Sequence, residues 1–260
     1  MPMLDGISLR DAFHKGPALK TIFSIIPSIE IIEMIAIAGF DAVILDMEHG
    51  PYSIDSLGPL ILAARARGIF PIARVQELSP ALIGAALDAG AAGILVPQVT
   101  SAAAAAEVVK AARFAPQGAR GVNPWVRAAD FDAERGWFAQ ANRSICVMAM
   151  IEGREGLEAL SDILSVEGLD GIFLGPVDMA QSLGVAGQPE HPIVIEALRQ
   201  TIVRATENGM GAAVFAPTVA AARRWLQLGV RLAAISEDTA VILSAFRRLI
   251  SELQVPISEA

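Results

Sequence analysis

Two acids and a histidine follow a short apolar stretch of the chain. Residues 42–45 are all apolar, and Asp46, Glu48 and His49 come directly after them. A run this short, partly β-branched and closed by a Gly-Pro pair, is typical of a buried strand. Because α/β folds carry their chemistry at the carboxyl ends of strands, these polar side chains are candidates for an active site.

Three further polar residues stand at or just after the ends of other apolar runs: Arg74, Glu152 and Asp178. In a barrel of parallel strands, all these ends face one mouth. Glu152 and Asp178 offer hard oxygen ligands that, with water, suit Mg²⁺ or Mn²⁺. The planar guanidinium of Arg74 suits a carboxylate or an enolate oxygen. Each acid alone could equally cap a helix, and Arg74 could simply pair with a neighbouring acid. The combination favours a metal site.

The same mouth is expected to bind an anion and to move a proton. Gly175 and Pro176 are expected to begin a helix that continues through Val177 and Asp178. The free backbone N–H groups at its start could bind a carboxylate. An ordinary turn with proline at the start of a helix would give the same sequence pattern. His49, with Asp46 three residues before it, could relay a proton near neutral pH, or it could be a structural histidine.

These parts together predict a metal-dependent aldolase. A metal beside an anion site would hold a 2-oxo acid as a chelate and stabilise its enolate. The His–Asp pair would handle the proton of the hydroxyl at which the carbon–carbon bond breaks. The chain has only three lysines, Lys15, Lys20 and Lys110, and none ends an apolar run. A Schiff-base lysine, which would stand on a strand, is therefore disfavoured.

Eight apolar runs alternate with helical stretches along the 260 residues, which predicts a single-domain (β/α)8 barrel. The strands are expected at 19–25, 42–45, 70–75, 93–96, 145–152, 170–174, 211–215 and 230–235. The helices are expected at 29–38, 54–67, 80–89, 102–113, 191–208, 218–228 and 238–253, with Ser28 and Ser101 among their N-caps. Residues 115–143 form a long connection, with a short helix expected around 131–141.

The composition excludes several other functions. The net charge is −8 and the basic residues are scattered, so a nucleic acid is not an expected partner. No uncharged apolar run reaches the ~18–20 residues of a membrane span. The single cysteine, Cys146, lies in an apolar run and is expected to be buried; no signal peptide is recognisable, so a cytoplasmic location is expected. The mean hydropathy of +0.50 is high, which indicates that part of the apolar surface is covered by another subunit.

Several motifs recur together in one known family: Phe40-Asp41, Asp46-Met47-Glu48-His49-Gly50-Pro51, Pro71-Ile72-Ala73-Arg74, Leu95-Val96-Pro97, Gly118-Ala119-Arg120-Gly121-Val122, Ile151-Glu152 and Phe173-Leu174-Gly175-Pro176-Val177-Asp178-Met179. Over residues 21–249 the chain resembles the HpcH/HpaI aldolases. The resemblance implies a class II pyruvate aldolase on a TIM barrel, cleaving 4-hydroxy-2-oxo acids such as 4-hydroxy-2-oxoheptanedioate or 2-dehydro-3-deoxy sugar acids to pyruvate and an aldehyde.

The resemblance also implies roles for individual residues. Glu152 and Asp178 would bind a divalent metal, Mg²⁺ or Mn²⁺ with Co²⁺ as a further candidate, and no organic cofactor is expected. His49 and Asp46 would form the proton-transfer pair. Arg74 would contact the pyruvyl oxygens, and the substrate carboxylate would lie on the turn Gly175-Pro176-Val177, against the amides of Val177 and Asp178. Family members are typically homohexamers, trimers of dimers that exchange the last helix.

Two departures and two alternatives remain. Met150 and the segment 123–125, which includes Trp125, differ from some aldolases of the family, so the aldehyde is left open. A CoA-ester lyase or a decarboxylating synthase could run different chemistry on the same enolate, but no basic cluster is present for CoA phosphates. A non-catalytic barrel would have no reason to keep these polar strand ends. Glu48 is expected to be a structural partner inside the mouth.

Overall fold

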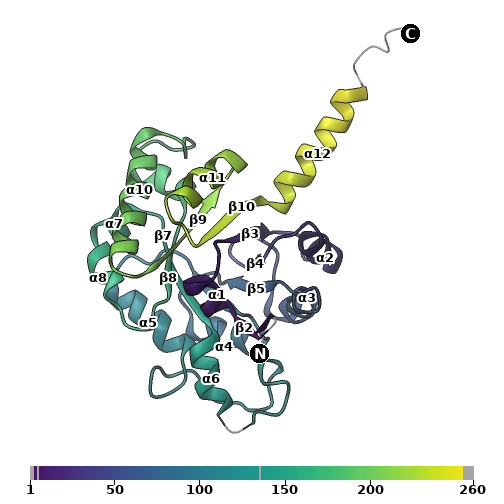
Figure 1. The fold of residues 1–260 in the computed structure, drawn as a ribbon, viewed down its shortest axis with the longest axis vertical. Helices are drawn as coiled ribbons and strands as arrows, with labels where there is room; N and C mark the ends of the chain where they lie inside the picture. Colours follow the sequence, from purple (N-terminus) through teal and green to yellow (C-terminus); the bar gives the residue numbers. More distant parts are fainter. Residues whose placement is uncertain (1–2, 5, 135, 254–260) are drawn as a thin grey trace.

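Eight parallel strands form a closed barrel in the computed structural model, which describes residues 3–4, 6–134 and 136–253 (Figure 1). Neighbouring strands follow the order β10-β3-β4-β5-β6-β7-β8-β9. The predicted (β/α)8 barrel is confirmed, and each predicted strand lies within two residues of an observed one. The strands are β3 (Leu19–Ser24), β4 (Ala42–Asp46), β5 (Phe70–Arg74), β6 (Gly93–Val96), β7 (Cys146–Ile151), β8 (Gly171–Leu174), β9 (Gly211–Ala216) and β10 (Leu232–Glu237).

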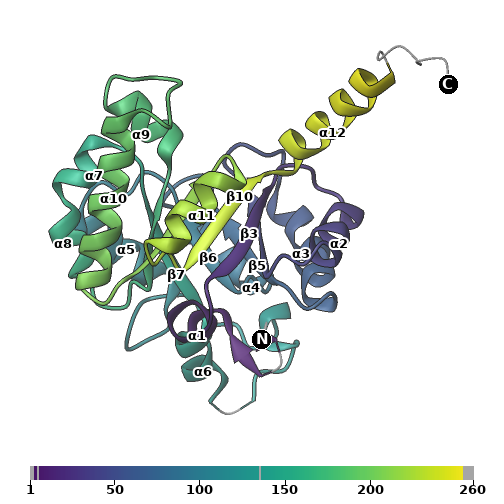
Figure 2. The ribbon, with the colours of Figure 1, turned by 45° about the horizontal axis from the view of Figure 1, so that its top comes forward.

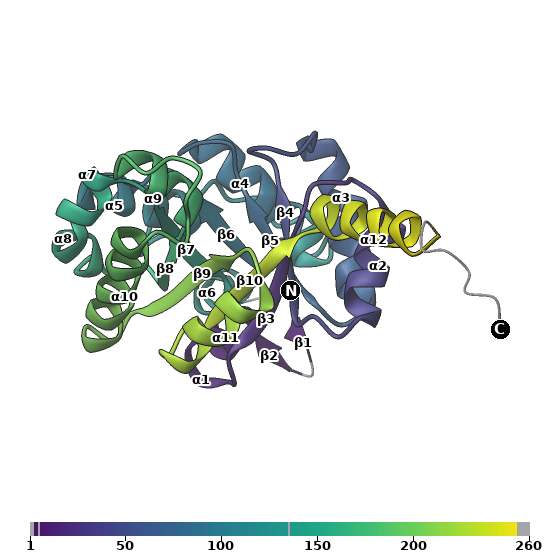
Figure 3. The same cartoon turned by 90° about the horizontal axis from the view of Figure 1, so that it is seen from above.

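Helices surround the barrel, except for the last one, which extends away from it (Figures 2 and 3). They are α2 (Ile29–Ile37), α3 (Ile54–Ala66), α4 (Pro80–Asp88), α5 (Ala102–Ala112), α6 (Trp137–Ser144), α7 (Arg154–Glu158), α8 (Leu160–Leu164), α9 (Pro176–Ser182), α10 (Pro192–Glu207), α11 (Val219–Gln227) and α12 (Asp238–Leu253). Ser28 and Ser101 accept hydrogen bonds from the amides of Ile31 and Ala104, so both predicted N-caps are confirmed.

The apolar side chains form two layers because each strand presents alternate residues to opposite faces. One layer fills the space between the strands and the surrounding helices, and the other fills the barrel interior. Cys146 is a free, fully buried thiol of the inner layer, as expected. Within the described residues, no helix has the length and apolar character needed to cross a membrane.

A helix that the sequence analysis did not predict closes the amino-terminal end of the barrel. A short pair of strands, β1 (Met3–Leu4) and β2 (Ile7–Ser8), leads into α1 (Leu9–Lys15). Phe13 of α1 is fully buried in the inner layer. A Cβ atom at Gly211 would lie only 2.2 Å from the Phe13 ring, and one at Gly171 only 2.7 Å. The two glycines therefore make room for the Phe13 ring between the strands.

A buried carboxylate joins this helix to the barrel. Asp170, just before β8, accepts hydrogen bonds from Arg113 at 2.6 Å, from Arg10 at 2.5 Å and from the Val147 amide at 2.8 Å, and His14 lies 3.5 Å away. Burial favours the neutral acid, but the hydrogen bond from His14 and the charges of Arg113 and Arg10 outweigh it. The pKa of Asp170 is therefore lowered.

The long connection after α5 has little regular structure. It contains a short 3₁₀ helix, Arg127–Ala129, and then α6. The helix expected to begin near Phe131 begins at Trp137 instead; Phe131 itself has a φ of 63°, which lies outside the helical region. Trp137 and Phe138 pack against the ring of Phe114, and this aromatic cluster attaches the connection to the barrel.

Candidate active site

Asp46 and Arg74 lie side by side at the carboxyl end of the barrel. They are the last residues of β4 and β5, and the parallel register sets them opposite each other. The guanidinium donates from Nε to Asp46 Oδ1 at 2.8 Å and from Nη2 to Oδ2 at 2.6 Å. Both residues are buried. Arg74 and Asp46 thus form a bidentate ion pair, the geometry in which arginine binds a carboxylate most strongly.

Arg74 has two further partners. Its Nη1 lies 3.0 Å from Glu48 Oε2, and its guanidinium lies 4.7 Å from the centre of the Phe23 ring. Burial disfavours the guanidinium charge, but the hydrogen bond to Asp46 and the charges of Asp46 and Glu48 outweigh it. The pKa of Arg74 is therefore raised. Glu48 is thus an ion-pair partner of Arg74 inside the mouth.

The link between Asp46 and His49 runs through the backbone. Asp46 Oδ1 accepts hydrogen bonds from the amides of Glu48 at 3.0 Å and His49 at 3.3 Å. The side chain of Asp46 is thus shared by Arg74 and this turn, whereas the sequence suggested the His49 imidazole as its partner. The His49 side chain lines a cavity of about 290 Å³ at the mouth, together with Glu48, Glu152 and others.

Glu152 lies in the same cavity, just beyond the end of β7. Its Oε1 accepts a hydrogen bond of 2.7 Å from the amide of Gln98, a residue with a φ of 54°. Burial disfavours the charged form, and the nearby acids Asp178 and Glu48 add to this effect, so the pKa of Glu152 is raised to about 7.

Gly175 allows Glu152 to approach the turn before α9. A Cβ atom at this position would lie 3.0 Å from Glu152 Oε2 and 2.8 Å from the terminal carbon of Met150. A side chain at residue 175 would therefore crowd both Met150 and Glu152. α9 begins at Pro176, as predicted, and its first amides have no partner within the helix.

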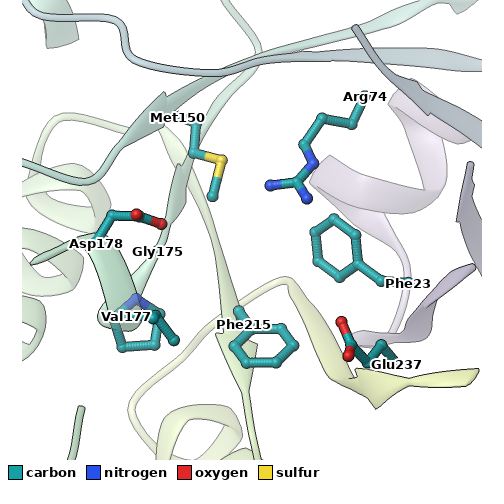
Figure 4. A pocket seen from close by; sticks show the side chains of 9 residues that line it. Phe23, Arg74, Met150, Gly175, Val177, Asp178, Phe215 and Glu237 are labelled. Atoms are coloured by element: carbon teal, nitrogen blue, oxygen red, sulfur yellow. The ribbon is translucent and has the colours of Figure 1, made fainter. Parts of the chain in front are cut away.

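A second cavity of about 110 Å³ adjoins this turn (Figure 4). Its lining includes predicted residues, namely Arg74, Gly175, Pro176, Val177 and Asp178. Asp178 lines both cavities and so connects the arginine side of the mouth with the Glu152 side. The structure therefore brings the predicted residues together at one end of the barrel.

The residues present fit a divalent metal. Glu48, Glu152 and Asp178 line one cavity, and their mutual repulsion would be relieved by a cation. The described residues include no group of three or more His, Cys, Asp or Glu side chains arranged to hold an ion. A metal held by Glu152 and Asp178 would therefore take its other ligands from water or substrate, as Mg²⁺ does at many enzyme sites.

Sequence reasoning missed several residues of the second cavity: Phe23, Phe215 and Glu237. Phe23 and Phe215 are apolar residues near the ends of apolar runs and carry no signal that separates them from the core. Glu237 lies beyond the predicted end of the strand at residue 235, whereas the observed strand β10 continues to Glu237. Met150 lines this cavity, whereas the Trp125 side chain is 72 % exposed on the long connection.

Comparison with known proteins identifies similar chains. Residues 21–245 match the model of the family described as HpcH/HpaI aldolase/citrate lyase. A 5-keto-4-deoxy-D-glucarate aldolase of Escherichia coli O139:H28 (strain E24377A / ETEC) is 36 % identical over 84 % of this chain and 85 % of its own length.

Two solved structures share the fold and part of the sequence. An HpcH/HpaI aldolase/citrate lyase family protein from Burkholderia cenocepacia J2315 is 32 % identical, with a TM-score of 0.90, over 95 % of this chain and 98 % of the other. The citrate synthase SbnG is 34 % identical, with a TM-score of 0.84, over 95 % of this chain and 96 % of its own.

Proposed function

Because this chain belongs to the HpcH/HpaI aldolase/citrate lyase family, we propose that it cleaves a 4-hydroxy-2-oxo acid, such as a 2-keto-3-deoxy sugar acid, to pyruvate and an aldehyde in a metal-dependent reaction. The match confirms the family predicted from the sequence and, with it, a carbon–carbon lyase. The observation that carries the substrate class is the convergence of Arg74, Glu152, Asp178 and the turn at Gly175 on two adjoining cavities.

In this proposal, Glu152 and Asp178 hold the divalent metal, which would act as a Lewis acid on the 2-oxo acid and stabilise the developing enolate charge. Mg²⁺ or Mn²⁺ is favoured because the ligands are hard oxygens, and Co²⁺ is a further candidate. The amides of Val177 and Asp178 receive the substrate carboxylate. Arg74, which lines the same cavity, donates to the pyruvyl oxygens.

His49 is proposed to carry the proton. In the cleavage direction the imidazole accepts the proton of the 4-hydroxyl as the bond between C3 and C4 breaks, and in the synthetic direction it returns that proton. Asp46 supports both partners, because its carboxylate holds the Arg74 guanidinium and the backbone amide of His49. The proton-transfer pair is thereby linked to the residue that contacts the enolate oxygen.

A homohexamer built from dimers that exchange the last helix is part of the proposal. α12 extends away from the barrel in all three views (Figures 1, 2 and 3). Several large apolar side chains lie exposed along it: Val241, Leu243, Phe246, Leu249, Ile250 and Leu253. A row of exposed apolar side chains along one helix is typical of a surface that packs against another subunit.

The proposed function is tested by pyruvate release from 4-hydroxy-2-oxo acids, with and without EDTA. We expect turnover to stop in EDTA and to return on addition of Mg²⁺, Mn²⁺ or Co²⁺. Glu152→Gln and Asp178→Asn should abolish metal-dependent turnover and weaken Mn²⁺ binding measured by calorimetry, whereas Glu158→Gln, an exposed acid on α7, should do neither. Full activity in EDTA would contradict the metal, and absence of pyruvate from every such substrate would contradict the aldolase.

The similarity to a citrate synthase supports a second candidate, in which an enolate is added to another carbonyl compound. The sequence offers no basic cluster for the phosphates of CoA, which argues against a CoA-ester substrate. Citrate formation from oxaloacetate and acetyl-CoA, assayed on the same preparation, separates the two. Citrate formation without aldol cleavage would favour the synthase.

A further inference from the structure

An acid that the proposed reaction does not use lines the pocket beside Arg74. Glu237 is the last residue of β10, and its carboxylate faces the cavity from the side opposite Asp178 (Figure 4). Phe23 lies between Glu237 and Arg74, and Phe215 lies beside Glu237. The pocket therefore has one end formed by the turn at Gly175, where pyruvate is proposed to bind, and another formed by Glu237 and two aromatic rings.

A β-bulge directs Glu237 into the pocket. Ala234 pairs with Thr21 and Glu237 pairs with Phe23, so β10 has one more residue than β3 between these pairs. Ser236, inside the bulge, has a φ of 60°. Leu232 and Ala234 face the barrel interior, and strict alternation would turn residue 237 outward. The extra residue restores an inward direction, a use of bulges that is common next to active sites.

The residues that follow hold this side chain in place. The Thr239 hydroxyl donates to Glu237 Oε1 at 3.1 Å. Asp238 is buried and accepts hydrogen bonds from the Ser24 hydroxyl at 2.9 Å and from the amides of Ile25 and Ile26 at 3.0 and 3.1 Å. Glu237 thus lies between a bulge and an anchored residue, so its carboxylate has a defined position in the pocket.

The charges of the pocket would not favour a second substrate carboxylate. Among the described residues that line it, Arg74 is the only basic one, and its guanidinium already contacts Asp46 and Glu48. Asp178 and Glu237 are acids, and the remaining side chains are apolar. A carboxylate on the aldehyde half would lose its hydration and meet a like charge, whereas hydroxyl groups could donate hydrogen bonds to Glu237.

We propose that Glu237 is a specificity-determining residue that admits neutral, hydroxylated aldehydes and rejects aldehydes that carry a second carboxylate. This inference rests on the proposed aldolase function and narrows its substrate to monocarboxylic 4-hydroxy-2-oxo acids. The substrate proposed for this chain therefore differs from that of its relative in E. coli O139:H28, because the glucarate named for that relative is a dicarboxylate. The pyruvate half of the reaction does not depend on it.

The test compares two aldehydes in the addition of pyruvate by the full-length, metal-loaded enzyme. Glyceraldehyde is the neutral hydroxylated probe, and succinic semialdehyde is the acidic one. The ratio of their kcat/KM values is measured for the wild type, for Glu237→Gln and Glu237→Ser, which remove the charge, and for Glu237→Asp, which keeps it. Glu207→Gln, at the exposed end of α10, controls for the loss of one remote negative charge. Exchange of the pyruvate methyl protons with D₂O, without aldehyde, reports independently on pyruvate binding and enolisation.

We expect the wild type to favour glyceraldehyde, and both charge-free variants to shift the ratio at least about tenfold toward the semialdehyde. Glu237→Asp and Glu207→Gln should keep the wild-type preference. A ratio unchanged in the charge-free variants, or a wild type that favours the semialdehyde, would overturn the role of Glu237 while proton exchange persists. A wild type that neither exchanges pyruvate protons nor adds pyruvate to either aldehyde would overturn the aldolase function itself, and this inference with it.

Discussion

Arg74 contacts three other side chains of the candidate site. Its buried guanidinium lies against Asp46, Glu48 and the ring of Phe23. These contacts fix the plane of the guanidinium before substrate arrives, so little reorganisation is needed when negative charge develops nearby. Because Asp46 and Glu48 already balance its charge, Arg74 does not neutralise Glu152 and Asp178, and a cation between these two acids would do so. The arginine cluster and the metal proposal therefore support each other.

Arg74→Ala is expected to lower kcat/KM for pyruvate release by about 10²–10³-fold, as is typical for the loss of one charge-stabilising donor. The variant also leaves Asp46 buried without its partner, so unfolding is measured beside activity. Arg74→Lys is the matched variant, since it keeps the charge and loses the planar fork. A folded Arg74→Ala enzyme with wild-type activity would contradict the role of Arg74 in binding pyruvate.

His49→Ala is expected to slow cleavage by about 10²–10⁴-fold, the range typical of a lost general acid–base group. Mn²⁺ binding should stay intact, because His49 is not a proposed ligand. Steady-state pyruvate release and calorimetric Mn²⁺ titration check the two statements. Wild-type rates in this variant would remove His49 from the mechanism and leave proton transfer to another group.

At the scale of elements, the amino-terminal end of the barrel depends on one buried acid. Asp170 joins β8 to Arg113, which follows α5, and to Arg10 of the closing helix α1. Arg113 is itself fully buried and donates to the carbonyls of Asn142 and Ile145. The candidate site lies at the opposite, carboxyl-terminal end of the barrel. In such barrels the amino-terminal end contributes to stability rather than to chemistry, and we assign that role to this polar network.

Asp170→Asn is expected to destabilise the fold by about 3–5 kcal/mol at neutral pH, because it leaves the buried Arg113 without its counter-charge. The lowered pKa of Asp170 sets the pH dependence: its stabilisation is complete above the ordinary value of 3.8 and is lost as the pH falls through the lower pKa of the folded state. Urea unfolding should therefore show a difference in the free energy of unfolding between the wild type and Asp170→Asn at neutral pH. This difference should disappear at acid pH. Asp162→Asn, an exposed acid on α8, is the control, and equal stability of both variants at neutral pH would refute the prediction.

At the scale of the whole molecule, α12 extends away from its own barrel. Asp238, its first residue, is its only buried residue among those described. Phe246 is 61 % exposed and Leu253 80 % exposed. A helix with so much uncovered apolar surface gains most of its stability from packing against another surface. This arrangement is what an exchanged helix in a dimer requires.

If the proposed oligomer forms, Phe246→Asp is expected to dissociate it into smaller species without unfolding the barrel, because the Phe246 side chain is exposed in the single chain. Light scattering coupled to size-exclusion chromatography measures the mass, and circular dichroism checks the fold. Gln227→Asp, an exposed position at the end of α11, adds the same charge elsewhere. A wild-type protein that runs as a monomer would refute the proposed oligomer.

The sequence alone determined the barrel, because buried parallel strands are short, nearly continuous apolar runs and the helices between them begin at polar caps. It also predicted which strand ends form the candidate site, since Asp46, Arg74, Glu152 and Asp178 interrupt an otherwise apolar pattern. It could not show α1, whose short apolar face becomes helical only by packing under the barrel.

Only the tertiary structure decided which of these groups meet. Asp46 is three residues from His49 in the sequence. The register between β4 and β5, however, places its carboxylate against the guanidinium of Arg74, which is 28 residues away in the sequence. Glu237 faces the pocket only because one extra residue in β10 reverses the alternation of side chains. Both results depend on pairing between strands, a long-range property that local periodicity does not contain.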